Sequence, residues 1–445
     1  MRIEKPVGPS QFITGTFEPA DLIVAVDVGS ARVACAIAEL GRARPRILAA
    51  ESATSFGIRG GEIVDVKRAS EAIQIAIDAT ADRAGIEVRT VVVGLSGDTK
   101  LFTSKAGLDL DHERRTVTVP DVQRLRRVLA GDAAPGRRIV HRFDGPYSIG
   151  DLHGIDSPEG LLGDRLEMQA TFLSTAADRL DNLLKAVREA GVEIETVSLE
   201  PVSCSLGALS MDERALGAAV LDFGAGAFRG ALWEGGKLRQ IHIVGQEGLP
   251  LQSPSGRGLM LGAPNSGMEG VVMAIARRFR IAPATAERLL RSHAALSETE
   301  LAALPASIEV AAVDGMGSVR IETRELSSTT EELLAPAVRS LREGLSGFSA
   351  GHTVGVVLTG GGARIRGMST WISKRFGGTP VRLGVPRWDV DPSVTLPDEF
   401  AGCNGCSLAG LLALGSEART QMNYRPHKSF LSKIGESIRT MAASL

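Results

Sequence analysis

One sequence pattern occurs twice in this chain, and it limits the folds that the chain can adopt. Residues 22–26 form a short apolar run, typical of a buried strand, and the turn Asp27-Val28-Gly29-Ser30 follows before a second apolar run begins. Much later, residues 218–221 lead in the same way into the turn Asp222-Phe223-Gly224-Ala225-Gly226 and a further apolar run. Because both copies have the order strand, turn, strand, we predict two related domains that face each other.

The remaining sequence alternates between strand and helix patterns, which predicts an α/β fold with sheets covered by helices. Strands are expected at residues 91–95, 192–199 and 354–359, and helices at residues 69–83, 176–190 and 408–414. Ser328 and Glu331 have the spacing of a capping box, so we expect a helix to begin there and to run towards Phe348.

A different pattern separates the two copies. Polar and apolar residues alternate over residues 105–120, a short helix is expected at 122–129, and strands are expected at 138–147 and 166–172. These elements predict a small inserted α+β domain. Residues 249–267 are rich in glycine, proline and serine, which is typical of a flexible loop.

An Asp-x-Gly turn between two strands suits a phosphate group for three reasons. Its backbone N–H groups point inward, its small residues allow close approach, and the Ser30 hydroxyl can donate a hydrogen bond. The carboxylates of Asp27 and Asp222, one at each strand end, suit Mg²⁺, which is usually held through water. Two such turns from opposed domains are therefore predicted to clamp the phosphate chain of a nucleotide between them.

Two further elements strengthen the prediction of a nucleotide site. Gly360-Gly361-Gly362 follows a buried strand, where adenine or ribose can lie against bare backbone. Glu200 lies at the end of another strand, just before a helix of small residues, where a carboxylate can position or activate water. Taken singly, each motif also has a structural explanation, because Asp-Gly turns close ordinary hairpins and a carboxylate favours a helix N-terminus.

Together these motifs resemble those of the actin and heat-shock-chaperone ATPase superfamily. The two Asp-x-Gly turns look like its phosphate loops, and residues 358–362 look like its adenosine motif. Two helices, one following Glu200 and one beginning near Leu408, look like its connecting helices. Within that superfamily, the motif at residues 59–65 and the inserted domain are similar to the FtsA family of bacterial cell-division proteins.

The resemblance implies a two-lobed actin-like ATPase fold that binds ATP and Mg²⁺. It implies that residues of both lobes contact the nucleotide: Asp27, Gly29, Ser30, Arg32, Asp222, Gly224, Gly226, Glu287, Gly360, Gly361 and Gly362. Asp27 and Asp222 are the expected Mg²⁺ ligands, through water, and Glu200 is the candidate catalytic residue.

The resemblance and the patterns together predict the following division of the chain. The N-terminal segment is expected to be a disordered leader rather than a signal peptide. The expected parts are a leader at 1–20, a first lobe at 21–97, 175–215 and 400–415, an inserted domain at 98–174, a second lobe at 216–399 with a helical subdomain at about 246–350, a linker at 416–427 and a membrane-targeting helix at 428–445.

The chain departs from the FtsA pattern in its second phosphate loop. Family members usually have a glycine-rich loop that ends in threonine, whereas Ala225 and Ala227 stand here. We expect the methyl group of Ala225 to crowd the phosphate, and Ala227 lacks a hydroxyl donor. A helix that usually offers a glutamate and a lysine to the ribose or adenine has Glu287 and Leu290, with arginines beside them. The sequence therefore predicts nucleotide binding with slow or absent hydrolysis.

The C-terminal segment, residues 428–445, has the pattern of an amphipathic helix. Its large apolar residues fall within one arc of roughly 100° at about 100° per residue, and its basic residues fall outside that arc. These apolar residues are Phe430, Leu431, Ile434, Ile438, Met441 and Leu445. We interpret the segment as a helix that lies in the plane of a membrane surface, as in the FtsA family. The alternative is a helix docked on its own domain.

Composition excludes several classes of protein. A net charge of -2 gives no reason to expect nucleic-acid binding, and no stretch reaches the ~20 apolar residues of a membrane span. Four cysteines in 445 residues argue against a disulfide scaffold and fit a reducing compartment. Cys403 and Cys406 have metal or redox spacing, but no second Cys/His pair matches it, so the alternative is a plain loop before a helix.

The tail and the second loop favour a scaffold over an enzyme. The resemblance implies a self-associating adaptor that tethers the FtsZ ring, through the FtsZ C-terminal peptide, to lipids at the cytoplasmic side of the inner membrane. It would act at the division site with other division proteins. The second hypothesis is an active ATPase or a sugar-kinase-like phosphotransferase on the same fold. The third is the related pilus-assembly adaptor, against which the basic amphipathic tail argues.

Overall fold

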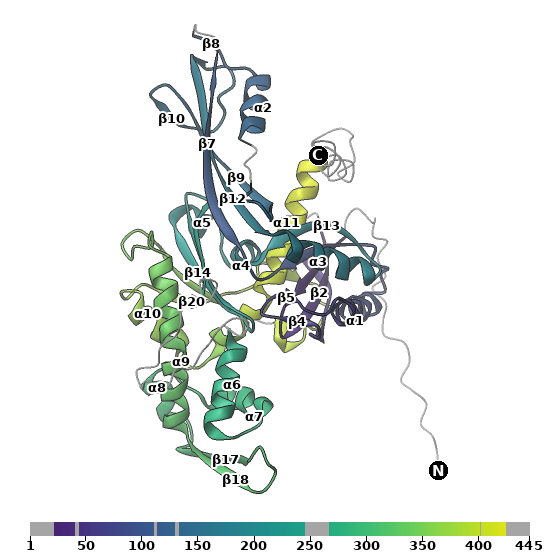
Figure 1. The fold of residues 1–445 in the computed structure, drawn as a ribbon, viewed down its shortest axis with the longest axis vertical. Coiled ribbons are helices and arrows are strands. Elements are labelled where there is room, and N and C mark those ends of the chain that lie inside the picture. Colours follow the sequence, from purple (N-terminus) through teal and green to yellow (C-terminus); the bar gives the residue numbers. More distant parts are fainter. Residues whose placement is uncertain are drawn as a thin grey trace.

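The structure is a computed structural model of the chain. It describes residues 22–40, 44–110, 114–129, 133–244, 267–400 and 402–423. The molecule is elongated, with two sheets side by side near its middle (Figure 1). The inserted domain forms one end and a helical part of the second lobe forms the other. The actin-like α/β architecture predicted from the sequence is therefore present in the described residues.

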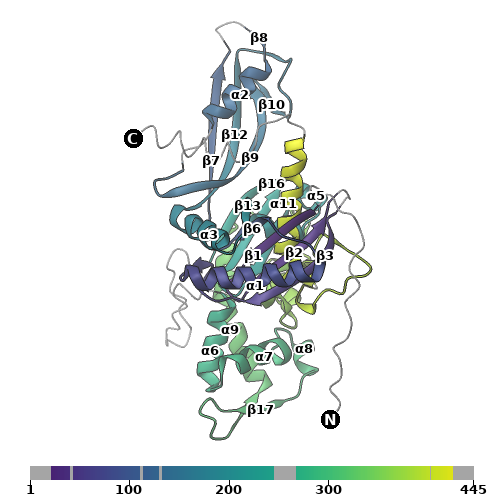
Figure 2. The same cartoon turned by 90° about the vertical axis from the view of Figure 1, so that its right-hand side faces the viewer.

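The first lobe is built on a six-stranded sheet with the strand order β13-β6-β1-β2-β3-β21. Its strands are β1 (Leu22–Val28), β2 (Arg32–Glu39), β3 (Arg46–Thr54), β6 (Thr90–Leu95), β13 (Glu193–Leu199) and β21 (Asp389–Val390). Helices α1 (Val66–Ala84) and α3 (Ala177–Glu189) lie on one face, and α11 (Cys406–Asn423) packs on the other (Figure 2). Because both faces are covered, the central strands have continuous apolar runs rather than alternation.

The second lobe repeats this arrangement. Its five-stranded sheet has the order β16-β15-β14-β19-β20, with β14 (Ala218–Phe223), β15 (Phe228–Glu234), β16 (Lys237–Ile243), β19 (Gly355–Thr359) and β20 (Val381–Leu383). In each lobe the first three strands pair antiparallel, and the first strand then pairs parallel with a later one. The two Asp-x-Gly turns therefore occupy equivalent positions in related sheets, as the repeated pattern predicted.

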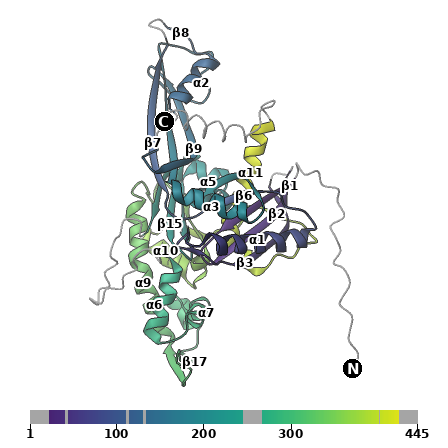
Figure 3. The ribbon, with the colours of Figure 1, turned by 45° about the vertical axis from the view of Figure 1, so that its right-hand side comes forward.

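Helices α4 (Glu200–Ala208) and α11 cross and pack against each other between the two lobes. Figure 3 shows α11, in yellow, beside the first sheet. At the crossing their backbones touch. A Cβ atom on Gly207 would lie 1.8 Å from the Cys406 carbonyl oxygen, and one on Gly410 would lie 1.8 Å from the Ser203 carbonyl oxygen. No side chain fits at either position, so two glycines set the distance between the connecting helices.

The inserted domain has its own sheet and core, which confirms the predicted small α+β insertion. Its strands β7 (Lys100–Asp109), β9 (Arg137–Ile149), β10 (Leu152–Ile155) and β12 (Arg165–Ala176) pair in the order β10-β9-β12-β7, and a small second sheet pairs β8 (Arg115–Thr116) with β11 (Leu162–Gly163). Helix α2 (Val119–Val128) covers the sheet and begins earlier than predicted. The reason is a capping box between Thr118 and Asp121 that the sequence analysis missed.

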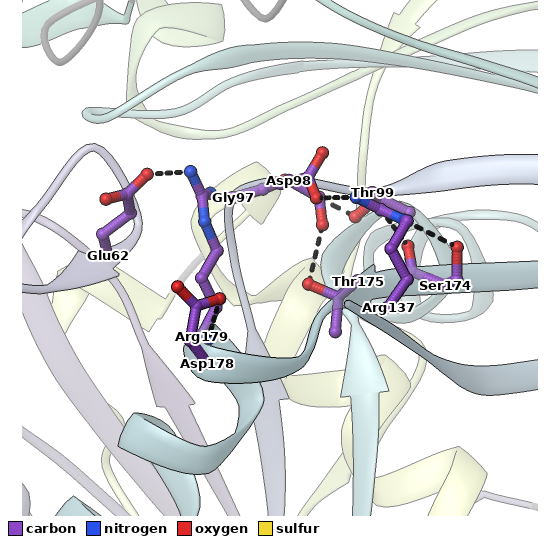
Figure 4. A network of polar contacts seen from close by, with 9 residues as sticks. All are labelled: Glu62, Gly97, Asp98, Thr99, Arg137, Ser174, Thr175, Asp178 and Arg179. Atoms are coloured by element: carbon purple, nitrogen blue, oxygen red, sulfur yellow. Dashed lines mark hydrogen bonds and ion pairs between the residues drawn. The ribbon is translucent and has the colours of Figure 1, made fainter. Parts of the chain in front are cut away.

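Polar contacts join the inserted domain to the first lobe (Figure 4). Arg137, at the start of β9, pairs with Asp98 and donates to Ser174 at both its hydroxyl (3.1 Å) and its carbonyl oxygen (2.8 Å). The Thr175 hydroxyl donates to the Asp98 carbonyl oxygen at 2.8 Å. The two chain segments that enter and leave the domain are thereby tied together where they meet the first lobe.

A half-buried histidine adds a second connection. The Nε2 atom of His141, on β9, accepts a hydrogen bond from the backbone N–H of Leu199 at 2.9 Å. Burial lowers the pKa of His141 to about 4, so the ring is neutral at pH 7 and this nitrogen can accept. Leu199 is the last residue of β13. The inserted domain is therefore hydrogen-bonded to the strand end that leads into Glu200.

The outer part of the second lobe is mainly helical. It contains α6 (Met268–Phe279), α7 (Pro283–His293), α8 (Glu298–Ala302), α9 (Thr323–Gly344) and α10 (Met368–Arg375), with a hairpin of β17 (Ser307–Ala311) and β18 (Ser318–Glu322). The prediction that Ser328 caps the long helix was wrong. Helix α9 begins at Thr323, and the Ser328 hydroxyl instead donates to the Glu325 carbonyl oxygen, one turn back within the helix.

The C-terminal helix of the first lobe is also longer than predicted. Helix α11 runs from Cys406 to Asn423, so residues 416–423, predicted as linker, are helical. Arg419 holds this extension in place by pairing with Glu195 at 2.6 Å. The leader, the membrane-targeting helix and all but the last residue of the glycine-rich loop lie outside the described residues.

The helix crossing leads to a prediction about stability. Replacing a glycine within a helix by alanine normally stabilises it by about 0.5–1 kcal/mol. In Gly410→Ala the new methyl group would meet the Ser203 carbonyl oxygen, so we expect destabilisation of about 1–3 kcal/mol instead. The midpoint of thermal unfolding should fall by roughly 1–3 °C.

The matched control is Gly351→Ala, because nothing lies within 4 Å of a Cβ atom added at that position. This variant should unfold within experimental error of the parent. If Gly410→Ala proved as stable as Gly351→Ala, the close approach of the two helices would be contradicted.

Candidate functional site

The two Asp-x-Gly turns meet in space although they are far apart in sequence. A Cβ atom on Gly226, in the second turn, would lie 2.3 Å from the Ser30 hydroxyl of the first turn. The same atom would lie 3.0 Å from the Cα of Gly60. The predicted juxtaposition of Ser30 and Gly226 is therefore present, and only a residue without a side chain fits at position 226.

A small hairpin lies beside the turns. It consists of β4 (Ile58–Arg59) and β5 (Glu62–Ile63), and the N–H of Gly61 at its tip donates to the Ser30 hydroxyl at 2.9 Å. Gly61 has a φ of +80°, and a Cβ atom there would lie 2.8 Å from Ser96. The hairpin tip thus contacts the first turn and the end of β6 together. The sequence analysis placed it only as a family motif.

Three carboxylates are gathered behind the turns. Asp27 lies near the end of β1, Asp222 lies near the end of β14, and Glu200 begins α4. Burial, followed by the charge of Glu200, raises the pKa of Asp27 to about 7. The same two causes raise the pKa of Asp222 to about 6. The charge of Glu200 therefore acts on both aspartates, which places the three predicted acidic residues close together.

Arg229 joins two of these carboxylates and was missed by the sequence analysis. Its Nη1 atom lies 2.9 Å from Asp222 Oδ2 and 3.1 Å from Glu200 Oε2. The side chain is only 5 % exposed. Burial alone would lower its pKa, but Glu200 and Asp222 raise it above the ordinary value, so the guanidinium is charged. Its sequence signal was a single charged residue within the apolar run at 227–233.

The remaining contacts of these carboxylates come from hydroxyl groups. The Ser96 hydroxyl, just after β6, donates to Glu200 Oε2, and the Thr359 hydroxyl, at the end of β19, donates to Asp222 Oδ1 at 3.2 Å. Both oxygens of Asp222 are thus engaged, one by Arg229 and one by Thr359. No ion pair to Asp27 occurs within the described part of the chain, which leaves this carboxylate the better fit to a hydrated Mg²⁺.

The glycine turn after β19 lies beside the same carboxylates. A Cβ atom on Gly360 would lie 2.7 Å from Asp222 Oδ1, and one on Gly362 would lie 2.6 Å from Met268 Sδ. At Gly361, by contrast, the nearest atom to an added Cβ is 3.9 Å away, on Asn404. The turn is therefore closely packed at Gly360 and Gly362 and open at Gly361, where a ligand can approach the backbone.

The start of α6 rests on the second turn. The N–H groups of Met268 and Glu269 donate to the carbonyl oxygens of Gly224 and Ala225, both at 3.0 Å. These bonds satisfy helix N–H groups that have no partner within the helix. The sequence analysis did not connect α6 with the turn, because more than forty residues separate them.

Two predicted nucleotide contacts make other interactions. The guanidinium of Arg32 donates to the carbonyl oxygens of Glu399 (3.2 Å) and Asn404 (3.1 Å) and stacks over Phe400. Glu287 lies on α7 and pairs with Arg291 of the same helix. Their roles towards a nucleotide stay predictions. In this structure Arg32 fastens the segment before α11 to the first sheet.

The cysteine pair lies next to the glycine turn. Cys403 and Cys406 are buried thiols, and Cys403 Sγ donates to the Gly360 carbonyl oxygen at 3.5 Å. Burial raises the pKa of Cys403 to about 11, so it is a protonated thiol at neutral pH. Within the described residues, the only group with metal-ligand spacing is Glu200, Cys204 and Asp222, two of which Arg229 already joins.

A cavity of about 690 Å³ lies elsewhere in the second lobe, where residues of α8 and the start of α9 line it. It is separate from the turns and carboxylates described above. The candidate site is therefore defined by convergent turns from both lobes, not by this cavity.

Comparison with known proteins decides the family. The family model for cell division protein FtsA matches residues 219–404, and the model for the SHS2 domain inserted in FtsA matches residues 97–174. Together the two models span more than half of the chain. The chain belongs to the FtsA family. The match at 97–174 coincides with the inserted domain of the structure, and the match at 219–404 contains the second turn, Arg229 and the glycine turn.

Individual FtsA proteins align over most of the chain. The chain is 26 % identical to cell division protein FtsA of Escherichia coli K12 over 435 residues, which cover 94 % of this chain and 96 % of that protein. It is also 26 % identical to FtsA of Pseudomonas aeruginosa over 82 % of this chain and 83 % of that protein. FtsA of Streptococcus pneumoniae is 31 % identical, but the alignment spans only about half the length of either protein.

Solved structures show the same fold at low identity. A PilM–PilN type IV pilus biogenesis complex has a TM-score of 0.58 at 15 % identity, over 88 % of this chain and 98 % of that one. MreB5 of Spiroplasma citri bound to ADP has a TM-score of 0.53 at 13 % identity, over 91 % of this chain and 99 % of that one. These neighbours establish the actin-like fold and leave function to be argued from the site.

Proposed function

We propose that the chain is an ATP-binding, self-associating adaptor of bacterial cell division that tethers the FtsZ ring to the cytoplasmic face of the inner membrane. The observation that carries the ATP part of the proposal is the meeting of Ser30 and Gly226, one from each lobe, beside the glycine turn. Membership of the FtsA family supports the division role. The neighbouring MreB5 was solved bound to ADP, which supports a nucleotide between the lobes.

The proposed binding mode uses the backbone more than charged side chains. Turn N–H groups around Gly29 and Gly224 would hold the phosphate chain, with the Ser30 hydroxyl between them. The adenosine would lie on the open middle of the glycine turn at Gly361. Mg²⁺ would supply positive charge to the phosphates, and Asp27 would hold it through water.

The scaffold proposal rests on two features, which are the residues of the second turn and the contacts of Glu200. The methyl group of Ala225 takes up space beside the phosphate, and Ala227 lacks the hydroxyl donor that a threonine would supply. Ser96 and Arg229 both contact Oε2 of Glu200, so one of its two carboxylate oxygens is already occupied. The residues of the second turn are the main reason that an active ATPase or phosphotransferase is disfavoured. The likeness to a pilus biogenesis complex is a likeness of fold alone.

Attachment to the membrane is assigned to the C-terminal segment. None of the helices in the described ranges is long and apolar enough to cross a bilayer. The apolar side chains of residues 428–445 are each worth ~1.5–3 kcal/mol on full burial, before ordering costs. One copy would therefore bind reversibly, whereas several linked copies would bind far more tightly. This requirement supports self-association, and the FtsZ peptide and other division proteins would be recruited to the resulting polymer.

The ATP proposal predicts that Gly361→Arg abolishes binding. The new side chain would occupy the open position on the glycine turn, and neither steric contact nor backbone φ opposes the change at that residue. Titration of labelled ATP with Mg²⁺ onto the purified protein measures the effect. Gly351→Arg, the same substitution at an open site outside the turns, should bind as the parent does. Unchanged affinity in folded Gly361→Arg would contradict the proposed site.

The scaffold proposal predicts slow turnover. Loss of one transition-state donor typically costs ~2.7–4 kcal/mol, so we expect phosphate release well below roughly 1 s⁻¹. The double change Ala225→Gly and Ala227→Thr should raise the rate, because it restores room and a hydroxyl. In the parent and in the double variant alike, adding Gly361→Arg should abolish phosphate release, because ATP would no longer bind. A parent rate of 1 s⁻¹ or more, on the order of an ordinary enzyme, would refute the scaffold interpretation.

The membrane proposal predicts that residues 428–445 become helical on lipid and carry the protein to vesicles. Ile438→Glu places a charge within the apolar arc and should release the protein. Ser432→Glu adds the same charge on the polar face and is the matched control. Anionic lipid should strengthen binding by ~1 kcal/mol per nearby basic residue, less at high salt. Vesicle co-sedimentation measures this, and equal sedimentation of a chain truncated after His427 would exclude the tail as anchor.

A further inference from the structure

We propose that Arg229 is a built-in counter-ion for Glu200 and Asp222, and that the chain therefore binds ATP with little dependence on Mg²⁺. The inference rests on the proposed ATP site and concerns what balances the negative charge within it. The residues that the sequence assigned to Mg²⁺ fit the metal only in part. Asp27 fits, whereas Asp222 is already bound to a cation of the chain itself.

The position of Arg229 follows from the strand pairing. In the hairpin of β14 and β15, Asp222 lies directly opposite Arg229, so both side chains project from the same face of the sheet. The guanidinium reaches beneath the second turn, where its Nη1 atom would lie 3.2 Å from a Cβ atom on Gly224. A cation of the second lobe is thus placed directly below the backbone that is proposed to hold phosphate.

The contacts of Arg229 displace a metal from this side of the site. Mg²⁺ demands a near-ideal octahedron of oxygen ligands and usually keeps several of its waters. The Nη1 atom lies 2.9 Å from Asp222 and 3.1 Å from Glu200, where metal-bound water would otherwise have to lie. The second oxygen of Asp222 is taken by Thr359. A divalent ion there would also be repelled by the buried guanidinium.

The same side chain offers a further donor to a ligand. The Nε atom of Arg229 is buried and has no hydrogen-bond partner among the described residues. An unsatisfied buried donor of a charged group is costly, and an anion is the partner that would satisfy it best. A terminal phosphate therefore has a fixed positive partner in the chain before any metal arrives.

The experiment is an ATP titration by calorimetry in excess Mg²⁺ and again in excess EDTA. For the parent protein we expect dissociation constants within about threefold of each other. Arg229→Met removes the cation and leaves Glu200 and Asp222 unbalanced, so affinity in EDTA should fall by at least about tenfold and recover in Mg²⁺. Arg229→Lys keeps the positive charge, although it cannot form the same fork, and should stay close to the parent in both conditions.

Each outcome decides between the two proposals. Binding of ATP by the parent only in Mg²⁺ would overturn the counter-ion role and leave the ATP site standing. No binding by the folded parent in either condition would overturn both. Unchanged affinity of Arg229→Met in EDTA would also overturn the role. Thermal unfolding without nucleotide checks that each variant is folded, and if Arg229→Met is not, the parent's own affinities in Mg²⁺ and in EDTA still decide the metal dependence.

Discussion

The crossing of α4 and α11 is the contact on which the rest of the structure depends. Gly207 and Gly410 let the two backbones touch, and a single methyl group at either position would force them apart. Glu200 is the first residue of α4, and Cys403, which contacts the glycine turn, lies just before α11. The spacing of the two helices therefore sets the distance between Glu200 and the glycine turn of the second lobe.

A chain of buried polar contacts runs across the same junction. It passes from Ser96 to Glu200, then through Arg229 to Asp222 and on to Thr359. Ser96 lies in the first lobe, and Glu200 begins the connecting helix α4. Arg229, Asp222 and Thr359 belong to the second lobe. Because a buried charge without its partner is far more costly than an exposed one, the lobes are held in register by electrostatics as well as by packing. The charges that position Glu200 also restrain it, which is consistent with a site adapted to binding rather than to turnover.

The inserted domain is connected to this junction. His141 accepts a hydrogen bond from the residue before Glu200, and Arg137 with Asp98 fastens the segments that enter and leave the domain. Ser96, two residues before Asp98, donates to Glu200 itself. The insertion therefore shares a short stretch of backbone with the candidate site.

The sequence by itself determined the local elements of this protein. Apolar runs predicted the central strands, the repeated turns predicted two related lobes, and the change of pattern predicted the insertion, because strand burial and turn chemistry depend on neighbouring residues. Only the tertiary structure decided which side chains meet. It paired Asp222 with Arg229, turned Arg32 towards the segment before α11, and set α6 on the second turn. These contacts join residues that are distant in sequence or lie on facing strands, and their geometry depends on the crossing of two helices that no local pattern specifies.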